Sequence, residues 1–197
     1  MNYFFCSLFC AFGENTFIMV RIKNKTGGTF MKVEIKKTSI NDGMDVYNFL
    51  CDIGVGENGF IMTPPKNEQD FKNLLKKYEK DSEKDQVPGR VPQEIFWMYV
   101  NDVIVGIIKI RPKLNKNLLI NGGNIGYSIS PNYRGKGYGK LIVKKGLEIL
   151  KAKGINKVLI TIYEDNIPSR KSVESNYGIL ENINNNLCRY WITLLTT

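Results

Sequence analysis

The stretch at residues 125–150, IGYSISPNYRGKGYGKLIVKKGLEIL, decides the fold expected of this chain. An alternating strand runs into a glycine-rich turn, and the turn continues into an amphipathic helix. Backbone N–H groups at a helix start have no partner within the helix and carry the positive end of its dipole. Glycines let an anion approach such a turn closely. The stretch therefore predicts an anion site at a helix N-terminus, built from Arg134, Gly135, Lys136, Gly137, Tyr138, Gly139 and Lys140.

The spacing of these glycines excludes two common phosphate motifs. A P-loop requires GxxxxGK followed by Ser or Thr, but Leu141 follows Gly139-Lys140 and Arg134 stands where the first glycine belongs. A dinucleotide-binding GxGxxG motif starting at Gly135 requires a third glycine at the position of Lys140. The turn is thus expected to bind an anion of another kind.

Length and composition favour one globular domain. The 197 residues are 43% hydrophobic and 24% charged, which is typical of a folded protein and not of a disordered one. The formal net charge is +9. The lysines are scattered and form no long basic run, so a solvated basic surface is favoured over a nucleic-acid-binding one.

The absence of histidine removes several kinds of active site. With no histidine, a Ser-His-Asp triad, a Cys-His dyad and a histidine-ligated zinc site are all excluded. The four cysteines form no CxxC pair, so no metal site is expected. We interpret the cysteines as reduced and the protein as cytoplasmic.

Residues 1–30 differ from the remainder of the chain. Their apolar run, residues 3–12, is shorter than the roughly 20 residues of a membrane span, and no basic segment precedes it as in a signal peptide. No membrane association is therefore expected. We interpret residues 1–30 as an N-terminal extension, with a translation start at Met31 as one hypothesis, and residues 31–197 as the domain. A gene lacking a GGAGG-like run before the Met31 codon would contradict that start.

Periodicity predicts a mixed α/β protein in the remaining chain. Alternating apolar residues indicate strands, and apolar residues at i, i+3, i+4 and i+7 indicate helices. A tight Asn101-Asp102 turn joins two of the strands. We expect one sheet of about six to seven strands with helices on both faces, in this order: strand 31–37, helix 40–51, loop 54–65, helix 68–81, strands 94–100 and 103–110, loop 111–123, strand 124–130, helix 138–153, strand 157–163, helix 166–177, and strands 179–182 and 187–194.

The pattern Arg134-x-x-Gly137-x-Gly139, between a strand and a helix, resembles the central motif of the GNAT superfamily of N-acetyltransferases. The resemblance covers the element order from residue 31 to 194. Several further segments resemble a bacterial group of predicted acetyltransferases of unassigned substrate: Val91-Pro92-Gln93, residues 122–127, residues 165–171 and Arg189-Tyr190-Trp191.

The resemblance implies that the cosubstrate is acetyl-CoA. N–H groups of residues 134–140 would bind its pyrophosphate, and the pantetheine arm would lie between strands 124–130 and 157–163. Backbone near Ile129 and Ser130 would pair with the arm and polarise the thioester. Asn166 and Ser169 match the second cofactor motif of the superfamily, and Arg170 and Lys171 would approach the adenosine phosphate more loosely.

The catalytic groups of the superfamily are not matched. Val173 stands where many members have a tyrosine acid, and Gly123 and Asn124 stand where others have a glutamate. The related group often has a histidine at the position of Asn124, whose amide takes no proton at neutral pH. The catalytic residues are therefore unknown from sequence, with Asn124, Glu94 and Tyr163 as candidates and Glu164 as a further carboxylate.

Together these features predict an acetyl-CoA-dependent N-acetyltransferase. It would transfer an acetyl group to a primary amine of a small molecule or peptide by direct attack in a ternary complex. The alternative is a non-catalytic acyl-CoA-binding or regulatory module, which the missing acid and base favour. The expected partners are acetyl-CoA and an amine acceptor, and a homodimer stays open.

Overall fold

The computed structural model describes residues 7–12, 15–24, 27–83 and 89–194. Its strands are β1 (Ser7–Phe12), β2 (Asn15–Asn24), β3 (Gly27–Lys37), β4 (Gly56–Glu57), β5 (Phe60–Ile61), β6 (Glu94–Val100), β7 (Val103–Ile110), β8 (Ile125–Ile129), β9 (Lys157–Tyr163), β10 (Ile179–Asn184) and β11 (Leu187–Thr193). Its helices are α1 (Met44–Ile53), α2 (Glu68–Ser82), α3 (Lys116–Ile120), α4 (Tyr138–Ala152) and α5 (Ile167–Glu174), with a 3-10 turn at Pro131–Tyr133.

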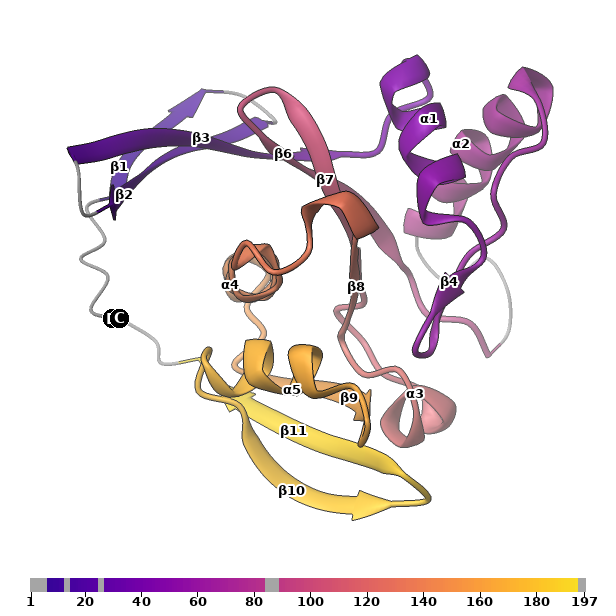
Figure 1. The fold of residues 1–197 in the computed structure, drawn as a ribbon. Helices are drawn as coiled ribbons and strands as arrows, with labels where there is room; N and C mark the ends of the chain where they lie inside the picture. The colour runs from indigo at the N-terminus through magenta and orange to yellow at the C-terminus, as the bar shows by residue number, and fades with distance from the viewer. Residues whose placement is uncertain (1–6, 13–14, 25–26, 84–88, 195–197) are drawn as a thin grey trace.

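The larger strands form two sheets instead of one. The first has the order β1-β2-β3-β6-β7-β8, and the second has the order β10-β11-β9. Each neighbouring pair within them is antiparallel. Figure 1 shows β8 at the edge of the first sheet, facing the second sheet below it. The predicted mixed α/β class with helices on both faces is confirmed.

Two apolar cores lie on opposite faces of the first sheet. On one face, α4 packs against β7 and β8, where Gly146 brings the helix close to Ile108, Ile110 and Ile125. On the other face, α1 and α2 pack against β6 and β7 around Trp97 and Ile107. Figure 1 shows α4 on one side of β8 and the pair α1 and α2 on the other. Strand β8 therefore separates two differently covered faces.

Most predicted elements are confirmed, and β6, β7 and β9 have the predicted bounds. Other bounds differ: β3 begins at Gly27 and not at residue 31, and α5 ends at Glu174 and not at residue 177. Helix α1 begins at Met44 and not at residue 40. Its N-cap is Gly43, because Asp42 accepts a hydrogen bond from the Ser39 N–H and holds residues 39–42 in a separate turn.

Two short elements lie in segments expected to be loops. The segment 54–65 contains the two-residue strands β4 and β5, which form a small hairpin. The segment 111–123 contains α3, capped by the Asn115 side chain. Strand β1 pairs with β2, and β2 pairs with β3. The assignment of residues 1–30 as an extension stays a prediction.

Candidate functional site

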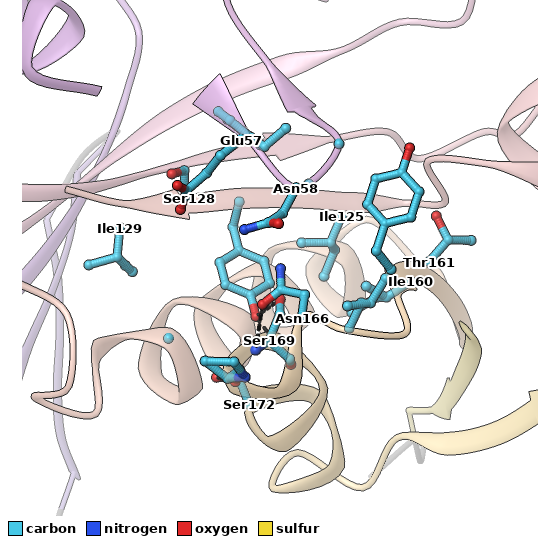
Figure 2. Close-up of a pocket in the computed structure, with 18 of the residues that line it drawn as sticks. Glu57, Asn58, Ile125, Ser128, Ile129, Ile160, Thr161, Asn166, Ser169 and Ser172 are labelled. Atoms are coloured by element: carbon cyan, nitrogen blue, oxygen red, sulfur yellow. Dashed lines mark hydrogen bonds between the residues drawn. The ribbon is translucent and has the colours of Figure 1, made fainter. Parts of the chain in front are cut away.

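A cavity of about 870 Å³ lies where β8 and β9 diverge. Strand β8 belongs to the first sheet and β9 to the second, so a wedge opens between them. The glycine turn, the start of α5 and the β4–β5 hairpin complete its wall. In Figure 2, Glu57 and Asn58 approach from the hairpin, and Asn166, Ser169 and Ser172 approach from α5.

The closed end of this wedge is a junction built around Asn124. A bridge pairs Gly123 with Ile160, and the Asn124 N–H donates to the Leu159 carbonyl at 2.7 Å. The Asn124 side chain is 3% exposed. Its Oδ1 accepts from the Leu159 N–H and its Nδ2 donates to the Arg111 carbonyl, each at 2.8 Å. Asn124 therefore joins the end of β7 to β9 and holds the two sheets together.

The glycine turn lies at the open end of the wedge. Gly135 and Gly137 have φ values of 74° and 83°, in the left-handed region that favours glycine. Gly137 is the N-cap of α4, whose first turn contains no acidic residue. The N–H groups of Tyr138, Gly139 and Lys140 have no acceptor within the helix because they precede its first complete turn. The turn therefore presents a positive, unobstructed helix start to the cavity.

Two residues of the predicted turn have other surroundings. The Lys136 Nζ lies 5.0 Å from the centre of the Tyr133 ring, and Lys136 is outside the cavity wall. A Cβ on Gly139 would lie 2.7 Å from the Ser172 Oγ. Gly139 lines the cavity, but its lack of a side chain is required for the contact between α4 and α5.

Arg134 connects the turn to the small hairpin. Its Nη2 lies 2.7 Å from Glu57 Oε1, and its Nε donates to the Ile129 carbonyl at 3.1 Å. Both partners of this ion pair are substantially exposed, so its contribution to stability is small. Its role is to orient the guanidinium beside the helix start.

The edge of β8 that faces the wedge carries backbone groups of alternate residues that do not bond to β7, and of these the Ile129 carbonyl accepts from Arg134 Nε. The Ser130 N–H and the Asn124 carbonyl bond to β7. Since successive residues of a strand point their backbone groups to opposite sides, the N–H and C=O groups of Ile125, Tyr127 and Ile129 face the wedge. The Ser130 side chain points elsewhere: it is 1% exposed and donates to Asp52 Oδ2 at 2.5 Å. A contact of Ser130 with the cofactor would therefore involve its backbone, and this assignment stays a prediction.

The start of α5 forms the opposite wall. Asn166 caps the helix by accepting from the Ser169 N–H, and the Ser169 hydroxyl lies 2.6 Å from the Tyr127 hydroxyl. Burial raises the pKa of Tyr127, although its hydrogen bonds to the serines act in the other direction. Lys171 lines the cavity, whereas Arg170 turns away and donates to Tyr190 and to the Glu164 carbonyl.

Residues 63–178 match the model of the acetyltransferase (GNAT) family. This match covers more than half of the chain. The chain belongs to the GNAT family. No curated protein matches its sequence significantly.

Solved structures with a similar fold are distant in sequence. Campylobacter jejuni N-acetyltransferase PseH in complex with acetyl coenzyme A has 13% identity and a TM-score of 0.57, covering 82% of this chain and 98% of that one. The microcin C7 self-immunity acetyltransferase MccE, in complex with acetyl-CoA and AMP, has 16% identity and a TM-score of 0.61, covering 82% and 92%. Mycobacterium smegmatis RimJ in complex with CoA-disulfide has 14% identity and a TM-score of 0.64, covering 82% of each chain.

The three catalytic candidates of this GNAT chain have different places in the fold. Asn124 has both amide atoms bonded to backbone at the junction. Tyr163 lines the cavity, with its ring 3.0 Å from the position of a Cβ on Gly59 of the hairpin. Glu94 lies outside the cavity wall and forms ion pairs with Lys37 and Lys153 at 2.8 and 2.7 Å. Burial acts to raise the pKa of Glu94, but these lysines lower it overall. The structure thus gives Glu94 a structural contact outside the cavity, and its catalytic role stays a prediction without support from the geometry.

The residues of the cavity wall that sequence reasoning did not assign to the site include Glu57, Lys109, Arg111 and Tyr127. A signal existed for two of them, because Lys109 interrupts the apolar run of β7 and Arg111 follows directly after the strand, at positions i and i+2, which lie on one face. Among the described residues, no group of three or more His, Cys, Asp or Glu side chains has the arrangement of a metal site. No helix in the same part of the chain is long and apolar enough to cross a membrane.

Proposed function

We propose that the protein is an acetyl-CoA-dependent N-acetyltransferase that acts on a primary amine in a ternary complex. The observation that supports this most strongly is the position of the glycine turn at the mouth of the wedge between β8 and β9. The pyrophosphate of acetyl-CoA would bind the N–H groups at the start of α4, beside Arg134 and Lys140. The pantetheine arm would then extend along the edge of β8 towards the junction.

The acetyl transfer needs one new bond and one broken bond. The amine nitrogen attacks the thioester carbonyl carbon, the C–N bond forms, and the C–S bond breaks. The amine loses a proton, and the CoA thiolate gains one, so the products are an N-acetylated amine and CoA thiol. An inward-facing N–H of β8, such as that of Ile129, would stabilise the oxyanion.

We further propose Tyr163 as the group that protonates the thiolate. It is the one of the three candidates that lines the cavity. Water in this open cavity would accept the proton of the amine, since the described wall offers no carboxylate at the junction.

The proposed function is tested by release of CoA thiol from acetyl-CoA in the presence of single amines of different chemical classes. We expect turnover with at least one class, and a product whose mass is increased by one acetyl group. Tight acetyl-CoA binding without turnover of any amine would favour the second candidate function, a non-catalytic acyl-CoA-binding module. That candidate is favoured by the position of Asn124 and Glu94 in structural contacts.

The role of Tyr163 is tested by the substitution Tyr163→Phe. We expect kcat to fall about 100-fold or more, as is typical for loss of a general acid, with little change in the Kd for acetyl-CoA. Tyr177→Phe is the matched control, because Tyr177 is 87% exposed and removed from the cavity. An unchanged kcat in Tyr163→Phe would assign protonation to solvent.

A further inference from the structure

Two basic side chains lie on the cavity wall away from the glycine turn. Lys109 belongs to β7 and pairs with Gly126 of β8. Two residues further along the chain, the Arg111 N–H donates to the Asn124 carbonyl. Both side chains lie on the sheet face of Ile107, which is the face covered by α1 and α2. The glycine turn instead leads into α4, on the opposite face. The cavity therefore has a second basic region.

The hydrogen-bond partners of these two cations carry no charge. Lys109 Nζ donates to the Ile61 carbonyl at 2.6 Å and lies 4.2 Å from the centre of the Phe60 ring. Arg111 Nε donates to Gln93 Oε1 at 2.8 Å, and its Nη1 donates to the Gly123 carbonyl at 3.3 Å. The pair is therefore solvated by dipoles and an aromatic ring, not by carboxylates.

Within the described part of the chain, the region carries positive charge and no carboxylate bonded to it. Burial, together with the positive charges of Arg111 and Lys77, lowers the pKa of Lys109 to about 8. Burial also lowers the pKa of Arg111. Among the described residues, the acidic side chains on the cavity wall are Glu57, which pairs with Arg134, and Asp165, at the start of α5. Two like charges in a region partly shielded from water cost free energy unless an anion binds beside them.

The space beside the two cations is open because Gly126 has no side chain. A Cβ there would lie 3.8 Å from Arg111 Nη1, 3.8 Å from Lys109 Cβ and 3.7 Å from the Phe60 ring. A ligand group over Gly126 would thus contact the Arg111 guanidinium and the stem of Lys109, whose Nζ lies beside the Phe60 ring. It would also lie beside Ile125, whose backbone faces the wedge near its closed end.

This region is distinct from the expected site of the cofactor phosphates. Gly126 precedes Ile129 by three strand residues, or about 10 Å, and the glycine turn lies beyond Ile129. The two basic regions also lie towards opposite faces of the sheet. One ligand would therefore place its phosphates at the turn, and a second ligand would meet Lys109 and Arg111.

We propose that the acceptor carries, besides its amine, an anionic group that binds between Lys109 and Arg111. This group is a carboxylate or a phosphate, both of which match the planar fork of an arginine. The proposal rests on the proposed function for the identity of the second ligand as an acceptor. It assigns the substrate class as amines with a carboxylate or phosphate group.

Anion binding is tested first with the glycine turn already occupied. CoA-saturated protein is titrated calorimetrically with inorganic phosphate and, separately, with succinate. We expect Arg111→Gln and Lys109→Gln each to weaken binding of one of these anions about 10-fold or more, and Arg111→Lys to retain most of it. Lys116→Gln, at an exposed position of α3, is the matched control for the loss of one charge. No binding to wild-type protein, or an equal loss in Lys116→Gln, would overturn the proposal.

Acceptor preference is then measured with amines of matched length: 3-amino-1-propanol, 1,3-diaminopropane, 4-aminobutyrate and 3-aminopropyl phosphate. We expect kcat/KM for one of the anionic amines to exceed that of the alcohol about 10-fold. In Arg111→Gln this preference should be lost because the KM for the anionic amine rises while kcat stays similar. A preference for the alcohol or the diamine would overturn the proposal. CoA binding without turnover of any amine contradicts the proposed function, and the anion titration then still decides whether Lys109 and Arg111 form an anion site.

Discussion

Replacing Gly137 with valine is expected to remove acetyl-CoA binding while the protein stays folded. No other atom lies within 4 Å of the position of a Cβ on Gly137, so the new side chain meets no part of the protein. It would instead occupy the space in front of the N–H groups that begin α4. Loss of two charge-assisted hydrogen bonds to phosphate, at about 1.5–3 kcal/mol each, weakens binding by roughly 100-fold or more.

The variant Gly154→Val is the control that separates backbone strain from the loss of ligand binding. Gly154 lies just beyond the other end of α4, has a φ of 77°, and also has no atom within 4 Å of its Cβ position. Both variants therefore lose about 1–2 kcal/mol or more of unfolding free energy to a left-handed backbone. Calorimetry should show normal acetyl-CoA affinity in Gly154→Val only. Normal affinity in Gly137→Val would contradict the proposed geometry of the turn.

The glycine turn at the mouth of the cavity was predictable because its structure is local. An anion site at a helix start needs a strand, glycines and a helix in direct succession, and residues 125–150 contain all three. Strands β6, β7 and β9 were predictable for the same reason, since each is a short apolar run rich in β-branched or aromatic residues, and a tight Asn101-Asp102 turn joins the first two. Whether the individual residues of the turn contact acetyl-CoA stays a prediction.

The remainder of the site depends on contacts between distant parts of the chain. The ion pair between Glu57 and Arg134 joins segments 77 residues apart, and no local pattern indicates it. Glu94 resembled a candidate base until the fold placed Lys37 and Lys153 beside it. The start of α1 was mispredicted because Asp42, which also accepts from the Trp97 indole, holds the preceding turn out of the helix.

The role of Asn124 also follows from distant contacts, and it leads to the second large expected effect. Asn124→Ala would leave the Leu159 N–H and the Arg111 carbonyl without their side-chain partners inside the junction. Each buried group left unpaired costs about 1–3 kcal/mol, so the free energy of unfolding should fall by about 2–5 kcal/mol. Thermal and denaturant unfolding of the variant measure this loss directly.

A matched control separates this structural role from a role in proton transfer. Asn117→Ala removes the same side chain from an exposed position of α3 and should leave stability nearly unchanged. If Asn124 acts through the junction, its alanine variant loses stability, and the pH dependence of kcat keeps its wild-type shape because no titrating group has been removed. A variant with wild-type stability and a strongly reduced kcat would instead give the amide a direct part in the reaction. The first outcome follows from the structure, because both polar atoms of the side chain are already bonded to the backbone that holds β8 and β9 together.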